Sequence, residues 1–149
     1  MAYKVMPMDW IQKIHAVTSM TSADLPQDAI EDMGLVQIAD NDVVKRVPDY
    51  LNATGSDLQY LEMASIFRAC YHITRNPMFG NKMFVSVKTM DISWTKGRVE
   101  VDAAASKFEQ QYEEMLAQIE DVEVLLPEYV SVNIFSIAEN EGDPIGGDG

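Results

Sequence analysis

The sequence holds few of the residues that several large protein classes require. It contains one cysteine among 149 residues, which excludes an internal disulfide bond. No run approaches the roughly 20 apolar residues of a membrane-spanning helix, and the first ten residues lack the apolar core of a secretory signal peptide. We therefore expect a protein without membrane contact that is made and assembled in the cytoplasm.

Basic residues are also scarce. Lys and Arg number 11 against 24 Asp and Glu, for a formal net charge of −13. Residues 1–54 carry −4, residues 55–102 carry +1 and residues 103–149 carry −10. Because DNA-binding proteins gain affinity by neutralising phosphates, this balance argues against sequence readout in a DNA groove. An acidic protein can still act beside DNA, by lining a channel through which DNA slides or by mimicking DNA.

Motifs that carry chemistry are missing as well. There is no G-x-S-x-G, no P-loop and no dinucleotide-binding glycine pattern. His15 and His72 are far apart and have no neighbours at metal-ligand spacing, and Asp40-x-Asp42 lacks the glycine and glutamate of an EF-hand. We expect no catalytic residue, no cofactor and no metal site. A small enzyme would need a pocket with strongly shifted pKa values, which a sequence cannot show.

Helical patterns occupy most of the first half of the chain. Residues 9–18 place apolar side chains at helical spacing, with Asp9 as a candidate N-cap. Residues 25–47 predict a short helix and a second one. Gly34 divides them, although a glycine is a weak break that a single helix can also tolerate. Pro48 ends this unit, because the residue before a proline is pushed out of the α region. Residues 49–56 are predicted to form a linker.

The strongest helical signal spans Asp57 to Arg75, with Ser56 as N-cap and Asn76-Pro77 as the stop. Its predicted buried stripe is Tyr60, Met63, Ala64, Phe67, Cys70 and Tyr71. Cys70 is expected to be a packed structural thiol, since unpaired cysteine is among the most buried residue types. This helix carries no catalytic spacing and is expected to serve packing.

A last helix is predicted from about Ala103 to Glu120, with Asp102 as its cap. Its apolar stripe is Phe108, Tyr112, Met115 and Ile119. Four acidic residues lie off that stripe and are candidates for a solvent-facing acidic surface: Glu109, Glu113, Glu114 and Glu120.

Two segments favour extended structure. Residues 83–101 combine alternation and β-branched residues, and indicate a β-hairpin or extended loop that contains Trp94. Residues 128–138 form the better strand candidate, without an equally strong partner strand in the chain. Such a strand often pairs with another chain. The residues that we expect in portal or inter-subunit contacts are Trp94, Tyr129, Val130, Val132, Ile134 and Phe135.

These patterns predict a mainly α fold. It is a small bundle of about three to four helices with a β-hairpin or loop insertion and an extended, strand-like C-terminal arm. We divide the chain into an N-terminal arm and helix at 1–24, a helical core at 25–120 with its β-containing loop at about 83–101, and a C-terminal arm with an acidic tail at 121–149. Among the aromatic residues, Tyr60, Phe67, Phe108 and Tyr112 are expected in the core.

The order of these segments resembles the head-to-tail connector, or adaptor, proteins of tailed bacteriophages. The similarity covers roughly residues 25–120. It consists of a short helical unit ending in Lys45, Arg46 and Pro48, the helix of Asp57–Arg75, a β-containing loop at 83–101, and a helix with the YEEML sequence of Tyr112 to Leu116. The first 20 or so residues and the acidic C-terminus depart from the family pattern.

The resemblance implies a structural virion protein. Members of the family form a dodecameric ring below the portal protein, extend its DNA channel and dock the stopper or tail. DNA would pass through without specific binding, since an acidic lumen repels phosphates. The residues that we expect to line this channel are Glu109, Glu113, Glu114 and Glu120. The protein would then be located in the neck of the virion.

A function of another class stays open. An acidic protein can act as a DNA-mimic decoy that inhibits a host DNA-binding or defence protein. Such a decoy displays its charges in regular rows on a rigid surface. Here much of the charge lies on one predicted helix and on the tail after residue 138. Tight binding to a nuclease or repressor, competed by DNA, would favour the decoy.

Overall fold

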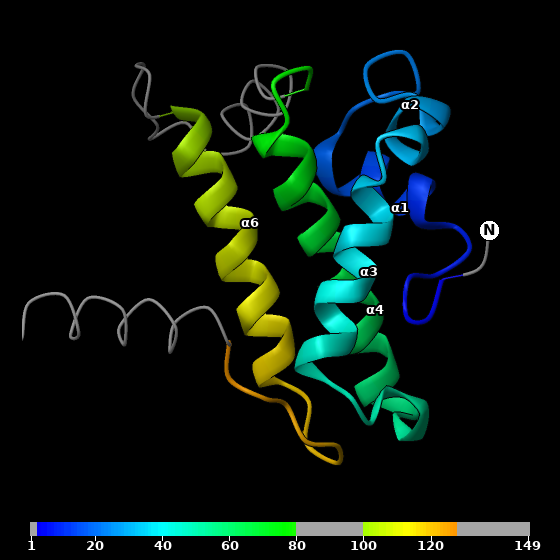
Figure 1. Cartoon of the computed structure of the whole chain (residues 1–149), viewed down its shortest axis with the longest axis vertical. Coiled ribbons are helices and arrows are strands. Elements are labelled where there is room, and N and C mark those ends of the chain that lie inside the picture. The colour runs from blue at the N-terminus through cyan, green and yellow to red at the C-terminus, as the bar shows by residue number, and fades with distance from the viewer. Residues whose placement is uncertain (1–2, 80–99, 128–149) are drawn as a thin grey trace, which may run out of the picture.

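The computed structural model describes residues 3–79 and 100–127, with side chains from residue 102 in the second range, and these residues are mainly helical. The long helices α4 (Gly55–Arg75) and α6 (Glu100–Ala117) pack along each other, and α3 (Leu35–Arg46) packs against α4 (Figure 1). The shorter elements are α1 (Trp10–Thr18), α2 (Gln27–Asp32) and the 3₁₀ turn η1 (Tyr50–Asn52). The predicted mainly α class is confirmed. Residues 83–99 of the hairpin or loop predicted at 83–101, and the strand predicted at 128–138, lie outside the described residues.

The predicted break between the first two helices of the core is confirmed. Gly34 separates α2 from α3 with φ +72°, a left-handed conformation that glycine adopts without the steric cost of a Cβ atom. At the other end of α3, Val47 leaves the helical region with φ −131° directly before Pro48. The predicted linker that follows contains η1.

The start of α4 differs from the sequence prediction. The helix begins at Gly55, and its N-cap is Thr54 in an extended conformation, so Ser56 lies inside the helix. Gly55 has φ +58°, which lets the chain turn from the extended Thr54 into the helix two residues earlier than its polar sequence indicates. The predicted end at Arg75 is correct.

The buried face of α4 also differs from the predicted stripe. Ala64 and Cys70 are buried as expected, but Tyr60, Met63, Phe67 and Tyr71 are only partly buried. The deepest large apolar side chains are Leu61, Ile66 and Ile73. The reason is that α4 packs against α1, α3 and α6 together, so its buried surface is wider than a single stripe.

The helix α6 begins and ends three residues before its predicted bounds. Glu100 and Val101, which we assigned to the end of an extended segment, are helical, and Asp102 lies within the first turn instead of capping it. Acidic residues in a first turn interact favourably with the helix dipole, and this favours the longer N-terminus. Phe108 and Tyr112 are buried as predicted, whereas Leu116 and not Met115 continues the buried face.

Both chain segments outside the bundle are attached to it. Residues 4–6 donate three backbone hydrogen bonds to the carboxylate of Asp40, and Trp10 is 3% exposed in the core. After α6, the carboxylate of Asp57 accepts the N–H groups of Glu120 and Asp121 at 3.1 and 2.8 Å. The N-terminal and post-helix segments therefore belong to the same packed structure as α3, α4 and α6.

Candidate functional site

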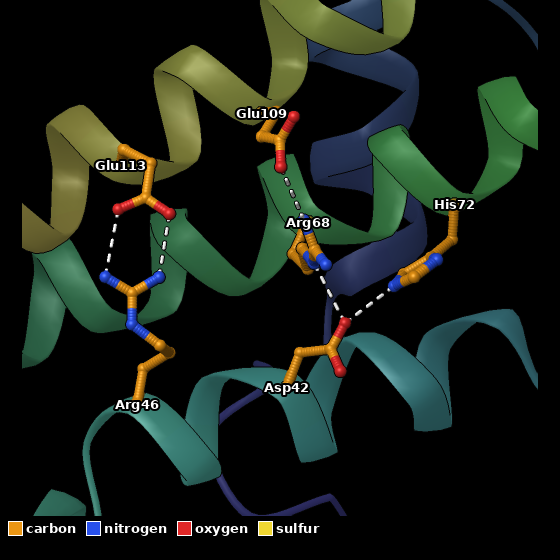
Figure 2. Close-up of polar contacts among 6 residues, drawn as sticks. All are labelled: Asp42, Arg46, Arg68, His72, Glu109 and Glu113. Atoms are coloured by element: carbon orange, nitrogen blue, oxygen red, sulfur yellow. Dashed lines mark hydrogen bonds and ion pairs between the residues drawn. The ribbon is translucent and has the colours of Figure 1, made fainter. Parts of the chain in front are cut away.

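A cluster of charged side chains joins the three long helices. Asp42 and Arg46 extend from α3, Arg68 and His72 from α4, and Glu109 and Glu113 from α6 (Figure 2). The members of each pair are four residues apart, and side chains at this spacing lie on one face of a helix. Local sequence thus presents three pairs of side chains, and packing of the helices brings the pairs together.

Asp42 is the centre of one half of the cluster. Its Oδ2 accepts hydrogen bonds from Arg68 Nε at 2.8 Å and from His72 Nε2 at 2.7 Å. Burial by itself raises the pKa of Asp42, but the hydrogen bonds from His72 and Arg68 outweigh it and hold the pKa below its usual value. Burial also disfavours the charged form of Arg68 and by itself lowers its pKa. The hydrogen bond and the charge of Asp42 outweigh burial, so the pKa of Arg68 lies above its ordinary value. Both partners therefore stay charged at neutral pH.

Arg46 and Glu113 form the other half. The guanidinium donates to both carboxylate oxygens, at 2.7 and 2.9 Å, in the bidentate geometry that arginine favours. Arg46 Nε also donates to the carbonyl of Leu125 at 2.5 Å. Although burial lowers the pKa of Arg46, the hydrogen bond and charge of Glu113 raise it above its ordinary value. This residue connects α3, α6 and the segment after α6.

Tyr112 lies between the two halves. The guanidinium carbons of Arg68 and Arg46 are 5.1 and 5.8 Å from its ring centre, within the range of cation–π attraction. Burial raises the pKa of Tyr112 to about 12, so the phenol is neutral at physiological pH. Arg68 also lies 3.8 Å from the carboxylate of Glu109.

A cavity of about 170 Å³ opens beside this cluster, and its charged lining is balanced. Three basic and three acidic side chains surround it, together with Tyr112 and Pro127. The shifted pKa values keep Asp42 and the two arginines charged, which suits a fixed network of ion pairs better than proton transfer at neutral pH. The arrangement can orient three helices and the segment after α6 relative to one another.

The four acidic residues that we predicted to line the channel fall into two groups. Glu109 and Glu113 face Arg68 and Arg46 inside the subunit. Glu114 and Glu120 are exposed, and Glu114 accepts a hydrogen bond from Gln110 at 3.3 Å. Whether any of them lines a channel stays a prediction. The predicted contact residues lie outside the described part of the chain: Trp94, Tyr129, Val130, Val132, Ile134 and Phe135.

The sequence did not reveal that the other four residues of the charged cluster are bound to one another and to α6. These residues are Asp42, Arg46, Arg68 and His72. Asp42 was considered only as half of an Asp-x-Asp motif, and His72 only as an isolated histidine. The available signal was the spacing of Arg68 and His72, which places two hydrogen-bond donors on one flank of the helix. Their shared partner is 26 and 30 residues away in the chain, and no local pattern identifies it.

Metal ligands, membrane-spanning helices and similarity to known proteins were also considered. Within residues 3–79 and 102–127, no three His, Cys, Asp or Glu side chains converge as a metal site requires. No helix in the described ranges combines the length and apolar character that crossing a bilayer demands. Comparison of the chain with protein-family models, with curated proteins and with solved structures found no match.

Proposed function

We propose that this chain is a head-to-tail adaptor of a tailed bacteriophage, a structural protein that forms a ring below the portal and docks the stopper or tail. The observation that carries the proposal is the bidentate ion pair of Arg46 and Glu113. Arg46 belongs to the segment ending in Pro48, and Glu113 to the YEEML sequence. Two of the four segments on which the resemblance rests are thus in direct contact, through residues that are 67 positions apart.

The arrangement of acidic residues supports the same function over the decoy. A DNA mimic requires rows of carboxylates that are available to a partner. Glu109 and Glu113 are instead drawn toward arginines of the same subunit. Exposed carboxylates such as Glu114 and Glu120 suit a surface past which DNA slides, because they offer phosphates no counterion-release gain.

In this proposal the undescribed segments have assigned roles. Residues 83–99 form the hairpin or loop insertion, and residues 128–138 form a strand-like arm that adds to the portal or to a neighbouring subunit. The protein is located in the neck of the virion, after assembly in the host cytoplasm. Neither a cofactor nor catalysis is part of this role.

Electron microscopy of lysates tests the proposal, using a phage that carries a nonsense mutation in this gene. Filled or leaking heads beside separate tails are expected, and a plasmid copy of the wild-type gene should restore joined particles. Normal virions without the protein would contradict the connector role. If the mutant phage assembles normally but fails only in hosts with a particular defence system, the decoy function replaces the proposal.

The same complementation assay tests the channel surface. Glu114→Lys and Glu120→Lys place positive charge at exposed positions, and we expect the double variant to join heads and tails but to slow DNA ejection. Asp32→Lys is the matched control, because Asp32 is exposed on α2, away from α6. Equal ejection rates in both variants would remove these two residues from the channel.

A further inference from the structure

The segment after α6 forms one wall of a groove that combines polar and aliphatic lining. The chain leaves α6 at Ala117 and turns back beneath the end of the helix (Figure 1). The groove has a volume of about 390 Å³ and lies beside the Arg46–Glu113 ion pair. Six Leu, Ile and Val residues line it together with the polar groups of that ion pair. Leu116, Ile119 and Val122 are core residues at most 8% exposed. The aliphatic surface that the groove presents therefore comes mainly from Val124, Leu125 and Leu126.

One residue fixes this wall in place. The N–H of Leu125 donates to the carbonyl of Arg46 at 2.7 Å, and Arg46 Nε donates back to the carbonyl of Leu125. Within the described part of the chain, the backbone groups of Val124 and Leu126 form no hydrogen bond. The segment thus resembles the edge of a sheet, which is open to pairing with an extended chain.

The groove also exposes apolar surface. Leu126 is 84% and Leu125 is 38% exposed. Large apolar side chains that gather around a concave surface indicate a contact site more strongly than single exposed ones do. The sequence continues past Leu126, the last residue that lines the groove, into the segment predicted to form a strand.

We propose that the groove receives residues 128–138 of a second copy of this chain. Apolar and polar residues alternate from Val130 to Ile134, so one face of an extended segment carries Val130, Val132 and Ile134. Those aliphatic side chains suit Leu125 and Leu126, the exposed large aliphatic residues of the groove. Backbone pairing with Val124 and Leu126 supplies affinity, and the alternate side chains supply register.

The connecting sequence favours a second copy over the segment of the same chain. To fill its own groove, the chain would have to reverse sharply just after Leu126. Tight hairpins use turns with positive φ at the first central residue or at both, which Gly, Asn and Asp supply. None of these three residue types occurs from Val124 to Val132. Pro127 cannot adopt a positive φ, and it disfavours the α region for Leu126, so neither residue favours a tight hairpin turn.

A contact of this kind is heterologous, because the arm of one copy meets the groove of the next. Such contacts generate closed rings when the rotation between copies closes. The inference thus deepens the proposed function by naming the contact that joins ring neighbours. It also stands apart from that function, since purified protein tests the contact without a portal or a virion.

Disulfide trapping between two differently tagged full-length chains tests the inference. One chain carries Ala117→Cys on the exposed groove wall, and the other carries Val132→Cys. A disulfide requires Cα atoms about 4.4–6.8 Å apart, and a heterodimer can form only between molecules. Ser131→Cys is the matched control, because residue 131 lies on the other face of the arm. Oxidised wild-type protein controls for Cys70, which is fully buried.

We expect several-fold more heterodimer from the Val132→Cys mixture than from the Ser131→Cys mixture. No heterodimer, or equal yields from both arms, would overturn the inference. The double variant Ala117→Cys/Val132→Cys tests the intramolecular alternative. A disulfide that forms only within that single chain shows that the groove takes its own arm, and this also overturns the inference.

A charge in the groove supplies a second test. Leu126→Asp should reduce the heterodimer yield several-fold while the unfolding midpoint stays unchanged, because this side chain is mostly exposed. Leu51→Asp is the control, since Leu51 is 82% exposed on η1 and does not line the groove. Equal effects of both substitutions would contradict the assignment. Failure of these tests leaves the lysate phenotype of the connector proposal unaffected.

Discussion

Asp40 and Asp42 lie two residues apart on α3 and accept hydrogen bonds from two different parts of the chain. Asp40 accepts backbone N–H groups of residues 4–6, whereas Asp42 accepts side-chain hydrogen bonds from α4. Residues at this spacing do not face each other on a helix. The two carboxylates therefore do not cooperate as a cation site. One attaches the N-terminal segment and the other attaches the long helix.

Asp40→Asn is expected to destabilise the protein. Asp40 is fully buried, and both of its oxygens accept backbone hydrogen bonds at 2.8–2.9 Å. The amide would replace one acceptor with a donor and leave a buried N–H unpaired, at a cost of about 2 kcal/mol. Urea denaturation measures the change. Asp32→Asn, at an exposed position on α2, should have little effect, and equal losses in both variants would contradict the role of Asp40.

The ion pair of Arg46 and Glu113 should show measurable coupling. In a double-mutant cycle, Arg46→Lys removes the bidentate geometry and Glu113→Gln removes the negative charge. We expect a coupling of about 1 kcal/mol between the two substitutions in the free energy of unfolding. The value is modest because Glu113 is 41% exposed and water screens the pair.

Arg75 and Asp102 provide the matched control for that cycle. They also join α4 to α6, but their side chains are 52% and 72% exposed. Such pairs contribute little in solution, so Arg75→Lys and Asp102→Asn should be additive. A larger coupling for the exposed pair than for Arg46 and Glu113 would refute this account of the cluster.

The stability of the protein should depend on Asp42 at acidic pH. Because hydrogen bonds from His72 and Arg68 outweigh burial, the pKa of Asp42 in the folded state is below the ordinary value of 3.8. Its contribution is fully present above that value and is lost as the pH falls toward the folded-state pKa, since the unfolded state binds the proton first. Urea denaturation from neutral pH down to about pH 3 should therefore give a steeper loss for the wild type than for Asp42→Asn. Identical slopes would show that the folded-state pKa is not depressed.

Cys70 should resist thiol reagents in the native state. Its side chain is fully buried, with 0% of its surface exposed to solvent. Burial raises the pKa of the thiol to about 12. Because the thiolate is the reactive form, labelling with Ellman's reagent should follow global unfolding and be complete in urea. Rapid labelling of the folded protein would place Cys70 in a mobile region. This result also bears on the disulfide-trapping controls.

Several features of the fold could be predicted because their causes are local. The break at Gly34, the end of α3 before Pro48 and the end of α4 at Arg75 follow from backbone preferences of single residues and their neighbours. The burial of Phe108 and Tyr112 follows from helical spacing. In the candidate site, spacing placed Glu109 and Glu113 on one face of a helix but did not identify their partners.

The sequence by itself determined where most helices lie and that Cys70 is packed, since propensity, breakers and periodicity act over a few residues. Only the tertiary structure decided which face of α4 is deepest, because three helices cover it. It also decided that Arg46 meets Glu113 and that Asp42 meets Arg68 and His72. These contacts join residues 26 to 67 positions apart, and their formation depends on how whole helices pack.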